Sequence, residues 1–231
     1  MYLCSYTARL VLLCISIAFA SFLAIDMVVD MLIPWLKLSY LCRVSSDIVV
    51  IDLTGSIKIE QPNTRVVHLM TVNDFRCLGC IKAKHIIIVG HGYSVKRALT
   101  LPLNTFALET SETPSILVVI SHPLLVLSEA IVKGCSDSIC HIAVTPRIFL
   151  FTIPIKFESV VLVTCGMGNV KNFAEEIHRA GARVVIYSAK SIAIDDVPSI
   201  VKEIVRILTT KGPCYIPKVL HVFRSIGCGN S

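Results

Sequence analysis

The sequence predicts an α/β domain built on a mostly parallel β-sheet. Several short runs rich in Val and Ile show no alternation of apolar and polar positions, and they lie at 47–53, 65–70, 85–89, 160–163 and 183–187. Runs that are apolar on both faces are typical of parallel strands covered by helices on each side. Toward the C-terminus these runs alternate with amphipathic segments of helical spacing. This alternation of strand and helix is the pattern of an α/β fold.

The bulk composition indicates a folded domain with a sizeable core. The chain has 231 residues, of which 54% are hydrophobic and 16% are charged. One domain plus an accessory segment fits this length and composition. The formal net charge is +6, but no run of Lys and Arg concentrates it in one stretch. We therefore expect no nucleic-acid partner.

The N-terminal stretch 10–25 contains no charged residue, and Arg9 and Asp26 flank it. We interpret this stretch as an uncleaved membrane anchor, because a spanning helix needs about 20 apolar residues and the chain stays largely apolar through 27–41. A signal peptide cleaved after Ala20 and a helix packed on the domain's own core are the alternatives.

The domain organisation follows from this interpretation. Residues 1–44 form a hydrophobic anchor and juxtamembrane segment, and residues 45–231 form the α/β domain. We expect a membrane-associated protein with a single N-terminal anchor, and the side of the membrane stays open.

Caps and spacing predict further elements. A helix begins at Asn169 or at Asn172, the latter with Glu175 in the capping-box position, and it ends at Gly181. The sequence also predicts a strand at 116–120, a helix from Pro198 through 208, and a final helix from about 217 to 226.

The ten cysteines raise the question of a metal site. Cys77 and Cys80 form a C-x-x-C pair, and Cys135, Cys140 and His141 form a second, looser cluster. A zinc site shows a second tight pair, and the spacing of Cys135 and Cys140 is too wide for one. We therefore expect disulfides or buried free thiols and no metal. Disulfides would fit an extracytoplasmic domain or the cytosol of a thermophile.

Two of the predicted strands end at reactive side chains. The run 85–89 leads into His91, which lies between two glycines, and the run 160–163 leads into Cys165. Open α/β sheets place their sites at the carboxyl ends of the strands, where a thiol and an imidazole supply a nucleophile and a base. A position between a strand and a helix would also favour the Cys165 thiolate through the helix macrodipole. A hydrogen-bonded structural histidine and a buried cysteine are the alternatives.

A His-Gly block followed by a strand-borne Cys is only part of a longer pattern. The stretch 173–186 reads as a helix, an Ala-Gly-Ala turn and a strand, and an apolar stripe follows at 200–208. This order resembles the caspase-like cysteine peptidases, and most closely their CHAT-domain branch. The similarity covers roughly residues 83–92 and 158–226. It implies a three-layer sandwich with a mostly parallel sheet.

The resemblance implies a cysteine endopeptidase. Cys165 would be the nucleophile and His91 the general base, and the N–H groups of Gly92 and Cys165 would form the oxyanion hole. Peptide bonds would be hydrolysed through a thioester, and the expected partner is therefore a protein or peptide substrate. The resemblance implies no metal and no organic cofactor. The long interval between His91 and Cys165 implies an insertion near 100–150. Thr164 and Gly166 depart from the family's pattern around the cysteine.

The substrate preference is tied to two acidic residues. Asp195 and Asp196 follow a predicted strand, where caspase-like pockets for a basic P1 residue place a carboxylate. The alternative is that one of them caps the next helix.

Two other functions stay open. The domain could have kept the caspase-like fold as a non-catalytic binding or scaffold module. It could also be an α/β-hydrolase with Cys165 as nucleophile and His221 as base. The bulky Val163 and Met167 argue against the α/β-hydrolase, because its nucleophile elbow requires small residues at these two positions.

Overall fold

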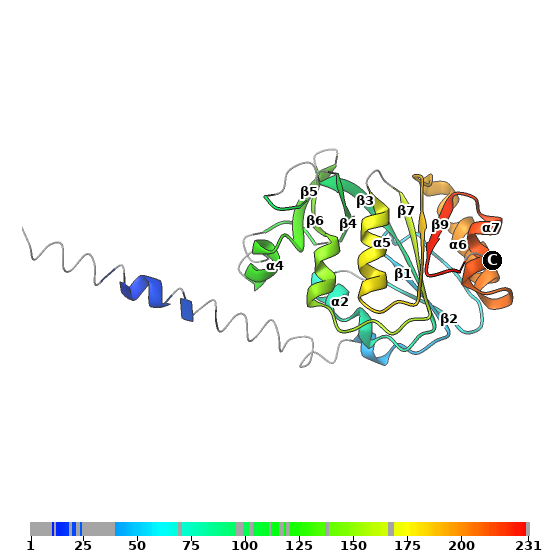
Figure 1. The fold of residues 1–231 in the computed structure, drawn as a ribbon, viewed down its shortest axis with the longest axis horizontal. Coiled ribbons are helices and arrows are strands. Elements are labelled where there is room, and N and C mark those ends of the chain that lie inside the picture. The colour runs from blue at the N-terminus through cyan, green and yellow to red at the C-terminus, as the bar shows by residue number, and fades with distance from the viewer. Residues whose placement is uncertain are drawn as a thin grey trace, which may run out of the picture.

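In the computed structural model, nine strands of the described chain form one mixed sheet with helices on both faces. The structure describes residues 11, 13–18, 20–21, 24, 40–68, 71–95, 99–101, 104–110, 112–115, 118, 121–136, 139–165 and 169–229, without the side chains of 135, 136 and 139. The α/β class that the sequence predicts is confirmed (Figure 1). The mostly parallel sheet is wrong, because four of the eight strand pairings among the described residues are antiparallel.

The parallel part of the sheet has the strand order β2, β1, β3, β7, β8. The bounds are Thr64–Val67 for β2, Ile48–Asp52 for β1, His85–Val95 for β3, Ser159–Cys165 for β7 and Val184–Ser188 for β8. Each of these strands overlaps a predicted run, although β3 continues well beyond 85–89. β9 (Phe223–Ile226) pairs antiparallel with β8 at that edge.

At its far end β3 leaves the parallel sheet. Its residues 85–91 pair with β7, whereas 92–95 pair antiparallel with β4 (Thr105–Glu109). β4 in turn pairs with β6 (Ile139–Val144), and β6 forms a hairpin with β5 (Ile131–Ser136). The residues near 100–150, where the family resemblance implies an insertion, thus form an antiparallel extension of the sheet.

Two long helices cover opposite faces of the parallel sheet. α5 (Val170–Arg179) crosses the near face in Figure 1 and buries Phe173 in one apolar core. α6 (Val197–Thr210) covers the other face and buries Ile204 in a second core. Successive residues of β3 enter the two cores alternately, which explains why its run is apolar throughout.

Shorter elements connect these strands and helices. They are the helices α2 (Val72–Arg76), α4 (Pro123–Leu127) and α7 (Ile216–Val219), and the 3-10 turns η1 (Tyr40–Arg43), η2 (Leu78–Cys80), η3 (Pro146–Phe151), η4 (Ile194–Asp196) and η5 (Pro213–Tyr215).

The ends of α5 follow the sequence signals in part. Gly181 lies after the C-terminus with a φ of +119°, and a Cβ there would clash with the Ile155 carbonyl oxygen, so the turn requires glycine. Asn169 precedes the helix, but its side chain makes no capping hydrogen bond. The capping box predicted at Asn172 is wrong, because the helix already begins at Val170.

The helix predicted at 217–226 is wrong. The chain forms only the short α7 there and continues as β9, in which Phe223 is buried in the second core. A disulfide between Cys214 and Cys228 joins the segments that flank α7 and β9. The strand predicted at 116–120 lies mostly outside the described residues, and Val118, which is described, is helical.

Of the predicted anchor 10–25, the structure describes residues 11, 13–18, 20, 21 and 24, and all of these are helical and exposed. Among the residues that the structure describes, no helix is both long and apolar enough to cross a membrane. The membrane anchor at 10–25 stays a prediction.

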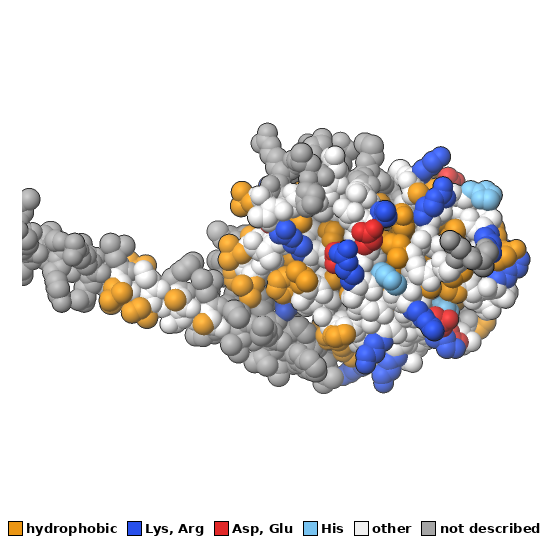
Figure 2. All heavy atoms as spheres, in the orientation of Figure 1, with side chains coloured by type: hydrophobic (Ala, Val, Ile, Leu, Met, Phe, Trp, Pro, Cys, Tyr) orange, Lys and Arg blue, Asp and Glu red, His pale blue; other side chains and the backbone are white. Residues whose placement is uncertain are grey.

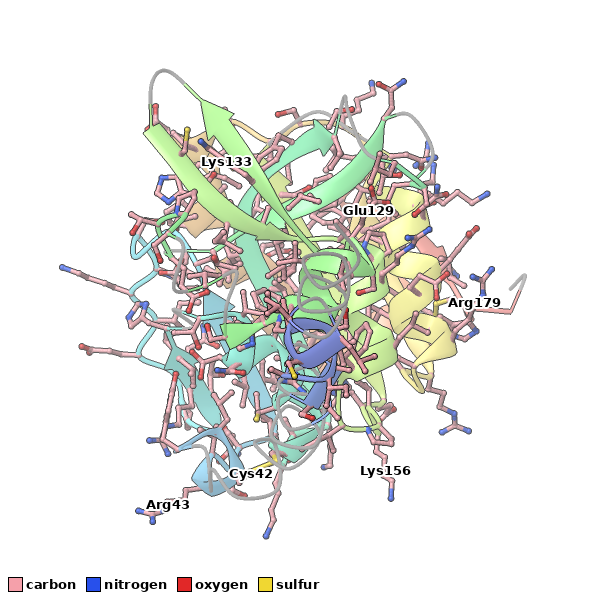
Figure 3. The ribbon with its side chains drawn as sticks, turned by 90° about the vertical axis from the view of Figure 1, so that its left-hand side faces the viewer. Cys42, Arg43, Glu129, Lys133, Lys156 and Arg179 are labelled. Carbon is pink, nitrogen blue, oxygen red and sulfur yellow. A yellow bond between two sulfur atoms is a disulfide. The ribbon has the colours of Figure 1, made fainter. Side chains whose placement is uncertain are left out.

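The two cysteines of the C-x-x-C motif have different roles. Cys80 forms a disulfide with Cys42, near the start of the domain (Figure 3), whereas Cys77 is buried and takes no part in this disulfide. Cys140 is also disulfide-bonded. Within the described part of the chain, no cluster of three or more His, Cys, Asp or Glu residues could hold a metal ion. Disulfides are typical of proteins from an oxidising compartment.

Glu129 fixes the loop 99–101 against the start of the antiparallel extension. Its carboxylate accepts hydrogen bonds from the Leu99 N–H, from the Thr100 N–H at 3.0 Å and from the Thr100 hydroxyl at 2.6 Å. Arg147 Nη1 lies 3.5 Å from the same carboxylate. Figure 3 shows Glu129 at the base of the hairpin whose first strand carries Lys133. The Thr100 hydroxyl is the main cause that lowers the pKa of Glu129.

We expect Glu129→Gln to lower the free energy of unfolding by about 2 kcal/mol at neutral pH, since hydrogen bonds to charged groups contribute roughly 1.5–3 kcal/mol. The folded state lowers the pKa of Glu129 below 4.5, the ordinary value for Glu. The ionised carboxylate therefore stabilises the folded protein fully above pH 4.5, and this stabilisation is lost as the pH falls through the lowered pKa. The advantage of the wild type should therefore shrink below about pH 4. Urea unfolding at several pH values measures this, with exposed Glu60→Gln as control. A difference that does not change with pH would contradict the assignment.

Candidate functional site

His91 and Cys165 lie side by side on neighbouring strands. β3 and β7 run parallel, and their register pairs His91 directly with Cys165, the last residue of β7. Neighbouring strands are about 4.8 Å apart, so the two residues are adjacent at the carboxyl end of the parallel sheet. The sequence predicts both residues at this edge, and the register brings them together.

The two side chains point to the same face of the sheet. Side chains alternate between the faces along a strand. Val89 and Val163, two residues earlier on each strand, both enter the core beneath α6. Cys165 packs against this core and is partly buried, and His91 is partly exposed. In the described part of the chain no hydrogen bond joins the imidazole to the sulfur, so the backbone alone aligns the pair.

Burial raises the pKa of the Cys165 thiol. The thiolate that the sequence predicts at this position is therefore wrong for the resting protein. The physical reason is the start of α5, which begins only at Val170, whereas a helix macrodipole acts within its first turn. The resting thiol is protonated at neutral pH and needs a base to remove its proton.

Packing explains the glycine that follows His91. A Cβ at Gly92 would clash with the ring of Phe106 on β4, so only glycine lets the two strands approach there. Phe106 thereby fixes the backbone next to His91. Gly92 lies inside β3 and pairs with β4. The oxyanion hole formed by the N–H groups of Gly92 and Cys165 stays a prediction.

Thr164, which precedes the cysteine, has a structural role. Its buried hydroxyl lies 2.8 Å from the hydroxyl of Ser188 on β8, and its N–H donates to the same oxygen at 3.3 Å. The Thr164 carbonyl accepts a hydrogen bond of 3.4 Å from the Ile192 N–H. The chain that follows β8 therefore passes directly beside Cys165.

This connection carries Asp195 and Asp196 in η4. Three residues of extended chain reach at most about 11 Å, which limits how far Asp195 lies from the Ile192 backbone. Both aspartates are exposed, and the Asp196 side chain does not cap α6 although it directly precedes the helix. The alternative that one of them serves as the helix cap is therefore wrong.

His221 lies farther from the cysteine than His91 does. It is exposed and precedes β9, which β8 separates from β7. Two strand spacings amount to about 10 Å. The α/β-hydrolase pairing of His221 with Cys165 thus lacks the adjacency that the strand register gives to His91.

Sequence reasoning misses a polar cluster beside His91. Glu109 is the last residue of β4, and its Oε1 lies 3.1 Å from His141 Nε2 on β6. Tyr93 follows His91 by two residues, and burial, followed by the charge of Glu109, raises the pKa of Tyr93. These residues meet only through the pairing of the antiparallel extension, which no local sequence pattern reveals.

Three cavities lined by described residues lie away from this edge. One of about 420 Å³ opens between α5, η3 and the start of β4, and Arg147 and Asn172 line it. Basic and acidic side chains are interspersed over α5 (Figure 2). Two others lie near Asp47 and Lys84, at the amino ends of the strands. None of the three is lined by a described cysteine, so none offers an alternative thiol nucleophile.

Comparison with known proteins gives no family assignment. No protein-family model matches the chain, and the curated proteins include no significant match. The function is therefore argued from the residues and their geometry.

Proposed function

We propose that this protein is a cysteine endopeptidase of the caspase-like type, closest to the CHAT-domain branch, with Cys165 and His91 as its catalytic dyad. The observation that carries the proposal is the direct register of His91 with Cys165 at the carboxyl end of the parallel sheet. A mixed sheet with helices on both faces is compatible with the three-layer sandwich that the resemblance implies.

The proposed reaction begins with proton transfer. His91 takes the proton of the Cys165 thiol, which burial keeps protonated at rest, and the sulfur attacks the peptide carbonyl carbon. The N–H groups of Gly92 and Cys165 stabilise the resulting oxyanion. The imidazolium returns its proton to the leaving amine as the C–N bond breaks and a thioester forms. His91 then deprotonates a water molecule, which attacks the thioester carbonyl carbon. As the C–S bond breaks, the imidazolium returns the proton to the Cys165 sulfur, and the peptide acid leaves. The proposed steps use only these groups.

The proposed substrate is a protein or peptide with Arg or Lys at P1. Asp195 and Asp196 support this preference, because both are exposed and lie on the connection that Ile192 fixes beside Cys165. A carboxylate at this position would pair with a basic side chain. We also propose that residues 10–25 tether the domain 45–231 to a membrane, on the strength of their uncharged sequence.

Hydrolysis by the full-length protein tests the dyad against the α/β-hydrolase alternative. We expect His91→Ala to lower kcat/KM by more than about 10³-fold on fluorogenic peptides with Arg or Lys at P1, because general acid–base catalysis contributes 10²–10⁴-fold and a protonated thiol is a poor nucleophile. His221→Ala, at an exposed position, should stay within about twofold of wild type. The reverse result would support the α/β-hydrolase, and equal turnover by wild type and both variants would contradict the dyad.

A non-catalytic scaffold is the remaining alternative. The raised pKa of the Cys165 thiol is the observation in its favour, because a protonated thiol is a weak nucleophile. This alternative predicts no hydrolysis by the wild type. It also predicts that Cys165 is alkylated no faster in the folded protein than in the urea-unfolded protein.

A further inference from the structure

We infer that Glu109 is a positioning residue for His91, so that the site is a row of Cys165, His91 and Glu109 across three adjacent strands. The inference rests on the proposed function and deepens it by extending the dyad to a triad. Glu109 touches neither the substrate nor the sulfur in this arrangement, and it acts through the imidazole.

The strand order places the three residues in one row. β4, β3 and β7 are consecutive neighbours in the sheet. The register of β3 with β4 pairs Gly92 with Leu108, and one further step along this antiparallel register sets Glu109 opposite His91. His91 itself pairs with Cys165 on β7.

Glu109 also shares a face with His91. Tyr93 and Ala107 are cross-strand partners, and they belong to one small apolar cluster. His91 and Glu109 lie two residues from them on the same strands, and side chains two residues apart point to the same face. Tyr93 crosses this face toward β5, where its hydroxyl lies against Gly134, and the Glu109 carboxylate lies beside His141 on β6.

The carboxylate of Glu109 is anchored on one side only. His141 Nε2 lies 3.1 Å from Oε1, and the two side chains are 27% and 23% exposed, so the pair is largely shielded from solvent. The second oxygen, Oε2, has no hydrogen bond to any described residue. A carboxylate held at one oxygen and open at the other is suited to accept a hydrogen bond from an imidazole N–H.

The chemistry of the site gives this hydrogen bond a purpose. One ring nitrogen of His91 takes the proton of the Cys165 thiol, and the other ring N–H donates to Glu109. The carboxylate accepts no proton. It holds the ring in one orientation and stabilises the imidazolium that forms, as the acid of a Ser-His-Asp triad does. This support matters here because burial makes the Cys165 thiol reluctant to give up its proton.

Kinetics of full-length variants test the inference. We expect Glu109→Gln to lower kcat about 10- to 100-fold, part of the contribution of general acid–base catalysis, with KM changed less than about twofold. Glu109→Asp should recover part of the kcat, because the charge remains. Glu175→Gln, at a carboxylate of the α5 surface, should match the wild type. A kcat within threefold of wild type in Glu109→Gln would overturn the inference. It would also be overturned if Glu109→Asp lost as much kcat as Glu109→Gln and both variants had a lowered melting temperature.

Alkylation by iodoacetamide separates this inference from the peptidase proposal. The labelling rate of Cys165 depends on proton transfer to His91 and not on peptide hydrolysis. We expect Glu109→Gln to slow the labelling of Cys165 in the folded protein and to leave its labelling in the urea-unfolded protein unchanged. A wild type that hydrolyses no peptide but shows this Glu109 dependence would overturn the peptidase and keep the row. Hydrolysis without any Glu109 dependence would overturn the row alone.

Discussion

Cys165→Ala should abolish peptide hydrolysis by the full-length protein while the thermal transition stays within about 2 °C of wild type. The loss should exceed about 10³-fold in kcat, since removal of a nucleophile leaves only the contributions of binding and the oxyanion hole. Stability should change little, because Cys165 is the partly buried last residue of β7 and its sulfur forms no disulfide. Initial rates on the P1-Arg peptide and a thermal scan measure the two effects.

The matched control is a second free cysteine. Cys14 lies in the stretch 10–25 and not in the α/β domain, so Cys14→Ala should retain wild-type activity. Turnover by Cys165→Ala close to that of the wild type would end the peptidase proposal. Loss of activity in both variants would show that the measured hydrolysis does not depend on the site at the end of β7.

Phe173→Ala should have the largest effect on stability, a loss of about 3–5 kcal/mol in the free energy of unfolding. The Phe173 side chain on α5 is completely buried, and its ring packs edge-on against Phe106 at 5.6 Å and Phe149 at 5.3 Å between ring centroids. The truncation would therefore leave a cavity between α5 and the start of the antiparallel extension. Because Phe106 also contacts the backbone at Gly92, hydrolysis should fall at lower urea concentrations than in the wild type.

Urea unfolding measures this loss, and an exposed apolar residue supplies the control. Leu127 on α4 is 73% exposed, so Leu127→Ala should change the free energy of unfolding by less than about 0.5 kcal/mol. A loss below about 1 kcal/mol in Phe173→Ala would mean that α5 does not carry the core in the way described.

The parallel strands could be predicted from the sequence because each is buried on both faces. The continuous apolar runs at β1, β3 and β7 report this burial directly, and they locate His91 and Cys165 at the carboxyl ends of two strands. The apolar stripe of α6 is equally explicit, since helical spacing repeats over several turns.

The remaining features depend on contacts between distant segments. Phe223 fits a helical stripe as well as a strand, and only pairing with β8 selects the strand. Glu109 directly follows Leu108, which pairs with Gly92, and no short motif encodes this register between strands. The raised pKa of Cys165 comes from burial, which the sequence around a strand end does not show. Local patterns thus predict elements, whereas tertiary pairing decides the site.

Covalent trapping with a peptidyl inhibitor identifies the residue that acts as the nucleophile. The full-length protein, with its disulfides intact, is treated with a peptidyl acyloxymethyl ketone that carries Arg at P1, and the modified residue is identified by mass spectrometry. The account predicts one modification, on Cys165, that is lost in His91→Ala and unchanged in His221→Ala. No modification, equal modification of Cys165 and Cys14, or undiminished labelling of Cys165 in His91→Ala would contradict it.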